Sequence, residues 1–237
     1  MTGVDTTIRT CGQSSDLALW LIDGCPWDPA AMTSERIIDR TAGWLGAAFL
    51  LTVLASEAGL SLPDEHATAP AVAAFYAEHR AVIIVLQLVG FVGAALLALF
   101  AWRLRVIHRG VAAAGLALAV TALAPGVITT VLALIADPQH PATAGGYNRF
   151  EPRGDDLLFL GVTLFAVTVV LVRGRSPHWL GVVAATVALC CLLRLTLEAL
   201  GRPRGVLDAL APLSFLLLMA ALTWLSFRGF PRPQPAE

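Results

Sequence analysis

The chain has 237 residues, of which 57% are hydrophobic and only 14% are charged, and its mean hydropathy is +0.74. This balance excludes an ordinary soluble domain and is typical of an integral membrane protein. All 16 basic residues are arginine, which argues against a Walker A phosphate loop, a Schiff-base enzyme and a Ser-Lys hydrolase. A net charge of -1 without any basic run also argues against a nucleic-acid partner.

The first forty residues are interpreted as a cytoplasmic or interfacial segment. Their longest apolar run, Leu17 to Ile22, is too short for an export signal and follows no basic region, so the segment is expected to stay attached. Asp28 and Pro29 suit the cap and first residue of a short helix through Ala30 to Arg40. This helix is either an interfacial docking element or a solvated lead-in, and both alternatives stay open.

Transmembrane helices are predicted from apolar length, because a bilayer core about 30 Å thick requires roughly 20 residues at about 1.5 Å each. Six runs approach this length and predict an all-α integral membrane bundle over residues 41–228, followed by a cytoplasmic tail over 229–237. The fourth run is the shortest, so its flanking charges must extend toward the headgroups. The six spans are Thr41 to Leu60, Ala81 to Trp102, Val111 to Ala136, Asp156 to Val172, His178 to Leu200 and Val206 to Phe227.

The arginines predict the orientation, because positively charged loops remain in the cytoplasm. With the N-terminus inside, ten arginines fall in inner segments and five in outer loops, which predicts cytoplasmic termini and a multi-pass protein of the plasma membrane. Tryptophan prefers the membrane interface, and four tryptophans fall at predicted inner ends of spans. These are Trp44, Trp102, Trp179 and Trp224.

Two further features lie between the third and fourth spans. Pro125 removes a backbone hydrogen bond within the third span, so a kink is expected there, for packing or as a hinge. The connection from Asp137 to Asp156 is the longest polar outer loop, and its glycines and aromatic residues could contact a ligand or cover the mouth of the bundle.

The cysteines and histidines predict neither a metal site nor a cofactor. Cys11, Cys25, Cys190 and Cys191 form no zinc-type spacing, and Cys190 and Cys191 are expected to act as small hydrophobic residues within a helix. The histidines are divided between the two sides of the predicted membrane.

Four ionisable residues inside the predicted spans are the candidate functional residues, because a charge in the membrane is costly to insert. Arg194 and Glu198 are spaced i,i+4 on one helical face, within reach of an ion pair, and are the candidate binding residues. Glu57 and Asp208 are the candidate catalytic carboxylates. All four are expected in the outer leaflet, where they form either a structural salt-bridge network or a vestibule with a protonatable carboxylate.

Three short motifs resemble a known group of proteins. The segment Phe75 to Arg80, the inner Trp102 to Arg105 and the helix entry Ser176 to Gly181 resemble the DUF4386-like multi-pass membrane proteins of high-GC, actinobacterial-type bacteria, whose function is unknown. The resemblance implies a six-helix bundle in a bacterial plasma membrane and transfers no catalytic or binding residue.

Three functional hypotheses follow. The first is a membrane protein whose polar cluster supports packing, passage of a lipid-like ligand or binding of a membrane partner subunit. The second is a membrane-embedded enzyme in which Glu57 or Asp208 is the general acid for a lipid or isoprenoid substrate, as in terpene cyclases, while Arg194 orients a carboxylate. The third is a sensor or regulator whose output is the segment 1–40. An apolar cavity ending at a carboxylate would favour the enzyme, and a closed bundle of paired charges would favour packing.

Overall fold

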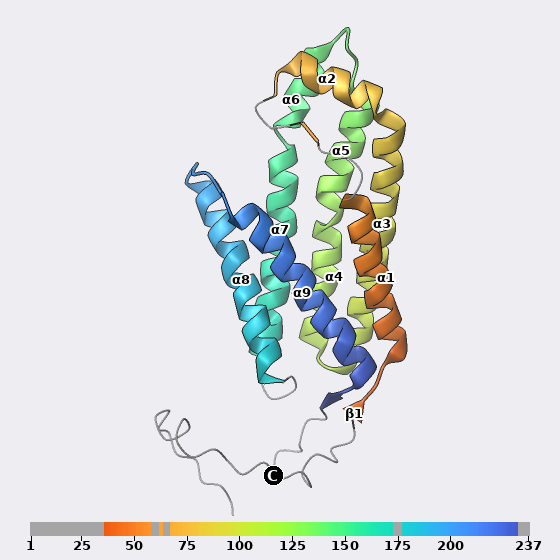
Figure 1. Ribbon diagram of the computed structural model, residues 1–237, viewed down its shortest axis with the longest axis vertical. Helices are drawn as coiled ribbons and strands as arrows, with labels where there is room; N and C mark the ends of the chain where they lie inside the picture. Colours follow the sequence, from red (N-terminus) through yellow and green to blue (C-terminus); the bar gives the residue numbers. More distant parts are fainter. Residues whose placement is uncertain (1–35, 58–61, 64–66, 173–176, 232–237) are drawn as a thin grey trace, which may run out of the picture. The chain divides into compact units, whose positions relative to one another are not determined.

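The computed structural model describes residues 36–57, 62–63, 67–172 and 177–231, and this part of the chain is almost entirely helical (Figure 1). The all-α prediction is therefore confirmed. The helices are α1 (Arg40–Glu57), α2 (Ala69–Glu78), α3 (Arg80–Arg103), α4 (Arg109–Thr121), α5 (Leu123–Ile135), α6 (Pro141–Asn148), α7 (Glu151–Leu171), α8 (His178–Ala199) and α9 (Leu207–Arg228), with a 3-10 turn at Leu104–Val106.

The apolar runs of the sequence coincide with these helices. Five helical stretches are long and apolar enough to cross a membrane, and α1 is a shorter apolar helix. The chain is thus a multi-pass helical membrane protein. The five stretches are Arg80–Val106, Arg109–Ile135, Pro141–Leu171, His178–Ala199 and Leu207–Arg228.

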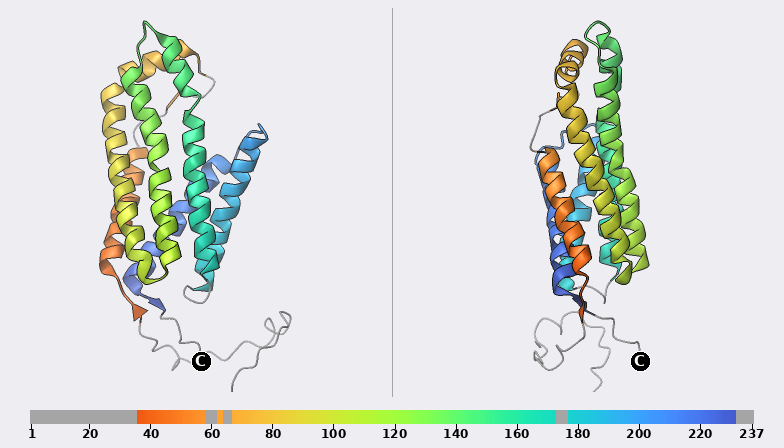
Figure 2. Two further views of the ribbon diagram at one scale, coloured as in Figure 1. Left: turned by 180° about the vertical axis from the view of Figure 1, so that it is seen from behind. Right: turned by 90° about the vertical axis from the view of Figure 1, so that its right-hand side faces the viewer.

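The long helices pack in two layers that Figure 2 shows from behind and from the side. α1, α9 and α8 contact one another in this order in one layer, and α3, α4 with α5, and α7 form the other. The layers are joined at both sides, by α1 against α3 and by α7 against α8. Their interior is a continuous apolar core that includes the fully buried Phe100, Leu118, Phe165, Leu218 and Leu222.

The outward faces of the long helices carry large apolar side chains. In the stretch Arg80–Val106, only 22% of the most apolar window is buried inside the protein. Such a continuous apolar exterior is not found on soluble monomers, so the surrounding solvent is hydrocarbon. Exposed examples from successive helices are Leu51, Val85, Val120, Leu134, Leu164, Val182 and Leu213.

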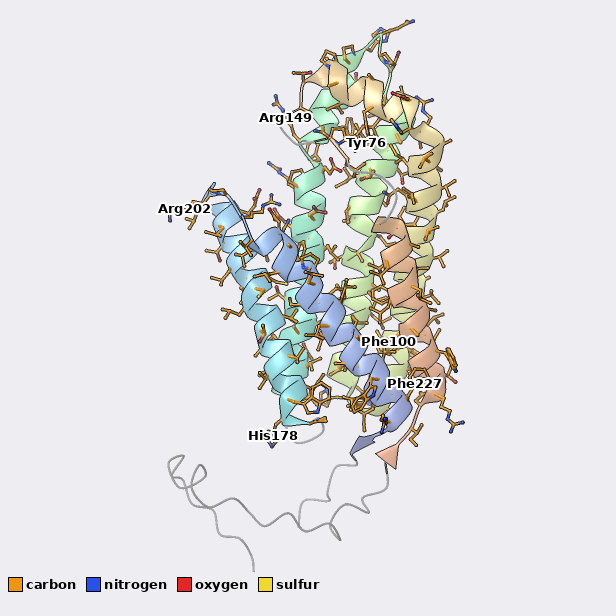
Figure 3. All side chains as sticks on the ribbon, viewed as in Figure 1. Tyr76, Phe100, Arg149, His178, Arg202 and Phe227 are labelled. Carbon is orange, nitrogen blue, oxygen red and sulfur yellow. The ribbon has the colours of Figure 1, made fainter. Side chains whose placement is uncertain are left out.

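The four tryptophans named above lie at one end of the helices and are partly exposed. Trp44 contacts Phe227 edge-on at 5.5 Å between ring centres, and Trp179 contacts Trp224 at 6.1 Å. Figure 3 shows Phe227 and His178 near this end, whereas Arg149 and Arg202 lie toward the other. This aromatic end matches the headgroup level of a bilayer.

The entry into α1 differs from the predicted helix over Ala30 to Arg40. Residues before 36 lie outside the described part, but the strand β1 (Arg36–Ile37) pairs antiparallel with β2 (Phe230–Pro231), and α1 begins only at Arg40. The helical prediction is therefore wrong for residues 36–39. The reason is a cap, because the Ala42 amide donates to Asp39 Oδ1 at 3.0 Å and fixes the helix start there.

A kink was expected at Pro125, and the structure has an interruption of the helix close to it. The third apolar run is divided into α4 and α5 by a break at Ala122, three residues before the proline. Since Pro125 has no N–H, it cannot donate to the carbonyl of Thr121, which lies next to the break.

The outer connection from Asp137 to Asp156 was wrongly predicted as a loop. It contains α6, and α7 begins at Glu151, five residues before the predicted start. Pro141 and Pro152 occupy first-turn positions, where a missing N–H carries no penalty, and Glu151 suits the positive end of the α7 dipole. Together with α2, which the sequence analysis missed, α6 covers the ends of α3 and α5.

Candidate functional site

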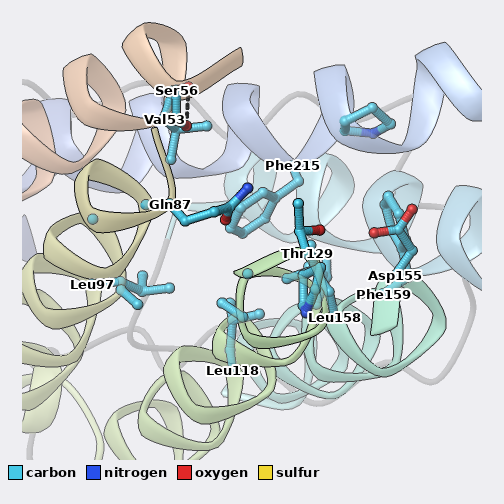
Figure 4. A pocket seen from close by; sticks show the side chains of 18 of the residues that line it. Val53, Ser56, Gln87, Leu97, Leu118, Thr129, Asp155, Leu158, Phe159 and Phe215 are labelled. Carbon is cyan, nitrogen blue, oxygen red and sulfur yellow. Dashed lines mark hydrogen bonds between the residues drawn. The ribbon is translucent and has the colours of Figure 1, made fainter. Parts of the chain in front are cut away.

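A cavity of about 750 Å³ lies between the two layers. Its wall is mainly apolar and is formed by α1, α3, α4, α5, α7, α8 and α9 together with the connection between α8 and α9. In Figure 4, Gln87 from α3, Phe215 from α9 and Asp155 from α7 point toward the same space. Apolar wall residues include Phe49, Val53, Leu97, Leu118, Leu158, Phe159 and Leu216.

Two prolines and a small-residue stretch create this space. Pro125 and Pro212 both line the cavity and both interrupt the hydrogen bonding of their helices, at the α4–α5 break and inside α9. Gly90 on α3 also faces the cavity, and a Cβ there would meet only the tip of Gln87, at 3.9 Å. Missing backbone hydrogen bonds and a missing side chain therefore both occur where the cavity lies.

One end of the cavity carries charge, centred on Arg194. Its side chain is buried, with a relative exposure of 3% for the residue, and its guanidinium lies 4.0 Å from the centre of the Phe159 ring. Nη1 is 3.3 Å from Asp156 Oδ1 on α7, and Nε is 3.3 Å from Asp208 Oδ1 on α9. Arg194 thus joins three helices, and Asp208 is one of its counter-ions.

Glu198 forms its ion pair with Arg204 and not with Arg194, although the i,i+4 spacing placed Arg194 within reach. Arg204 lies in the connection between α8 and α9, and its Nη1 is also 3.8 Å from Asp208 Oδ1. The hydrogen bond and charge of Glu198 raise the pKa of Arg204 above its ordinary value, despite partial burial. Arg194, Asp208, Arg204 and Glu198 therefore form one connected set of ion pairs, and the binding roles predicted for Arg194 and Glu198 stay predictions.

Two carboxylates of the site were missed by the sequence analysis, which assigned them to a loop. Glu151 and Asp155 occupy i,i+4 positions on α7, and both line the cavity. The signal was available in Glu151-Pro152, a typical helix start that is followed by an apolar run. Tyr76 on α2 is fully buried beside Glu151, and this burial, together with the carboxylate, raises the pKa of its hydroxyl well above the ordinary value.

The other candidate, Glu57, is the last residue of α1, and its side chain lies outside what the structure describes. Its neighbour Ser56 lines the cavity. A catalytic role for Glu57 or Asp208 stays a prediction, as does the output role of residues 1–40. Within the described ranges, no group of three His, Cys, Asp or Glu residues is arranged to hold a metal ion.

Fold and site together define a multi-pass helical membrane protein with a mainly apolar, partly open cavity that ends in a charged cluster. Comparison with family models, curated proteins and solved structures found no match. The function is therefore inferred from the geometry of this cavity.

Proposed function

We propose that the chain binds an elongated, lipid-like amphipathic molecule within the bilayer. The ligand's hydrocarbon part would occupy the apolar wall region, and its polar head would lie at the charged end near Arg194 and Asp155. The observation that carries this proposal is the cavity itself, since its volume of about 750 Å³ lies within the range of about 300–1,000 Å³ for ligand pockets.

A purely structural role explains the ion pairs but not the space beside them. Arg194 and Arg204 join α7, α8 and α9, as a packing network would. Protein interiors, however, contain few voids larger than a water molecule, because every void loses packing contacts. A large apolar cavity with charges at one end instead favours binding of a molecule with an apolar part and a polar head.

The test is binding of an uncharged, long-chain fluorescent lipid to the purified protein in nanodiscs. The variant Gly90→Leu would fill the cavity at a position where a side chain has room, and it is expected to weaken probe binding at least about tenfold. Gly181→Leu is the matched control, because the same change on α8 meets no atom within 4 Å and lies outside the cavity lining. Equal binding by wild type and Gly90→Leu would refute the proposal.

We also propose that α1 crosses the membrane, which gives six spans with both termini in the cytoplasm and a plasma-membrane location. The 18 residues of α1 correspond to about 27 Å of helix, close to the thickness of the hydrocarbon core. The arginine distribution and the shared tryptophan end support this orientation. Reporter fusions at residues 1 and 237 should both be active on the cytoplasmic side, and opposite locations would contradict the proposal.

An enzymatic role is the second candidate, because the cavity ends at carboxylates. In that case Glu57 or Asp208 would donate a proton to a bound lipid or isoprenoid, and Arg194 would orient a carboxylate. Lipid extracts of cells that express wild type, Glu57→Gln or Asp208→Asn should then differ in one product, measured by mass spectrometry. Identical extracts from all three would leave binding as the function.

A further inference from the structure

Two uncharged polar side chains line the cavity, Gln87 on α3 and Thr129 on α5. At about 1.5 Å per residue, Gln87 lies about 10 Å from the start of α3, and Thr129 lies about 9 Å from the end of α5. Both are therefore inside the membrane-spanning part of their helices. A Cβ added at Gly126, one turn before Thr129, would lie 3.0 Å from Gln87 Oε1. The Gln87 carboxamide thus lies against the part of α5 that carries Thr129, and Figure 4 shows both side chains beside Phe215 in the cavity.

Neither of these side chains has a hydrogen-bond partner among the described residues. Thr129 is buried, with a relative exposure of 3%, whereas Gln87 is half-buried. The neighbouring Thr130, by contrast, donates its hydroxyl to the Gly126 carbonyl at 2.7 Å. An unpaired carboxamide and hydroxyl in an apolar wall at membrane depth are costly, so a bound molecule that pairs with them would gain affinity.

The charged side chains at the end of the cavity already have partners. The two guanidinium groups pair with three carboxylates, and Glu151 faces the Tyr76 hydroxyl. Asp155 also has an interaction partner. The charges of this end therefore do not require a ligand of opposite charge. The three paired carboxylates are Asp156, Glu198 and Asp208.

We propose that the ligand of this cavity is a neutral long-chain lipid whose polar group is a hydroxyl, bound by the Gln87 carboxamide and the Thr129 hydroxyl. This inference rests on the proposed binding function and specifies its ligand class. A hydroxyl both donates and accepts, so it can accept from the Gln87 amide and donate to Thr129 Oγ1. A charged head would lose its hydration in the cavity beside charges that are already paired. The hydrocarbon chain of the ligand would extend along the apolar wall toward Leu97 and Leu118.

The experiment is competition against the uncharged fluorescent lipid in nanodiscs, with a probe that carries no hydroxyl or carbonyl group. The competitors are decanol and decane, which share one chain and differ only in the hydroxyl, and their partition into empty nanodiscs is subtracted. Wild type should favour decanol by about tenfold or more. In Gln87→Leu/Thr129→Val the preference should fall to about one while the probe still binds, and each single variant should lower it partly. Decyltrimethylammonium and decyl sulfate should both displace the probe from wild type less well than decanol.

The matched control is Gln139→Leu/Thr196→Val, which makes the same two changes at exposed positions outside the cavity lining and should keep the wild-type preference. Equal displacement by decanol and decane in wild type, with normal probe binding, would overturn the inference and leave the proposed binding function intact. A preference that persists in Gln87→Leu/Thr129→Val, or stronger displacement by either charged competitor, would also overturn it. Failure of the probe to bind wild type would instead remove the binding function, and the inference with it.

Discussion

Arg194 Nε lies 3.3 Å from Asp208 Oδ1, a contact that joins α8 to α9 at the charged end of the cavity. The same guanidinium reaches Asp156 on α7, so one buried cation holds three helices at the place where the two layers meet. Its planar guanidinium can pair with two carboxylates at once, and a lysine ammonium cannot do so with the same geometry.

Replacing Arg194 with methionine should destabilise the protein. The change keeps much of the side-chain length but leaves Asp156 and Asp208 without their shared cation. We expect a loss of about 2–3 kcal/mol, below the about 3–5 kcal/mol of a fully buried pair, because both carboxylates are partly exposed. Chemical unfolding in detergent measures the difference, and Arg202→Met, at an exposed position nearby, should change it by less than about 0.5 kcal/mol.

The membrane-spanning helices were predictable because a hydrocarbon environment requires long runs of uncharged, apolar residues. An uncharged run of about 20 residues has few alternatives to a spanning helix, so α3, α8 and α9 lie within a few residues of their predicted bounds. The position of the four tryptophans at one end of the helices was predictable for a related reason, since indole prefers the membrane interface. Arg194 and Asp208 were recognisable as candidate site residues because charge inside such a run is costly.

The features that the sequence did not predict depend on tertiary contacts, which no local sequence pattern encodes. Glu198 pairs with Arg204 because the connection after α8 turns back over it, a path that the i,i+4 rule does not contain. Glu151 and Asp155 were assigned to a loop because they are charged, although Glu151 is the first residue of α7 and Asp155 lies in its second turn. The cavity is lined by Pro125, close to the break between α4 and α5, and by Pro212 inside α9, but whether such prolines leave a cavity depends on the neighbouring helices.

Asp39 should give the protein a specific acid sensitivity. Although partial burial opposes it, hydrogen bonds from Arg103 and from the Ala42 amide hold the pKa of this carboxyl below its ordinary value. A lowered folded pKa means that the stabilisation is complete above about pH 4, the ordinary value, and is lost as the pH falls through the folded value. Asn can still cap the helix but cannot pair with Arg103, so Asp39→Asn should be less stable at neutral pH by about 0.5–1 kcal/mol, with a difference that shrinks in acid.

The control for this pH dependence is Glu78→Gln, which removes an exposed carboxyl at the end of α2. Between pH 7 and pH 3, the free energies of unfolding of wild type and Asp39→Asn should converge, whereas the difference between wild type and the control variant should stay constant. A constant difference across the whole range would show that the Asp39 carboxylate does not contribute through its charge.

Gly161 should not tolerate a methyl group. On α7, a Cβ at this position would lie 2.1 Å from Thr121 Oγ1 and 3.3 Å from the Leu118 Cα of α4. Gly161→Ala must therefore shift one helix against the other, and we expect a loss of about 1–3 kcal/mol. Gly181→Ala is the matched control, since nothing lies within 4 Å and the better helix propensity should stabilise it by up to about 1 kcal/mol. Equal stability of the two variants would contradict the close α4–α7 packing.

Pro125 links the helix break to the cavity, so its removal should affect both. Pro125→Ala restores an amide that can donate to the Thr121 carbonyl, which favours one continuous helix across the break at Ala122. We expect stability to be unchanged or raised, and binding of the uncharged lipid probe to weaken about threefold or more as this wall of the cavity straightens. Pro141→Ala is the control, because the first position of α6 requires no N–H and does not line the cavity. Unchanged probe affinity in Pro125→Ala would show that the break is a packing feature without influence on the ligand site.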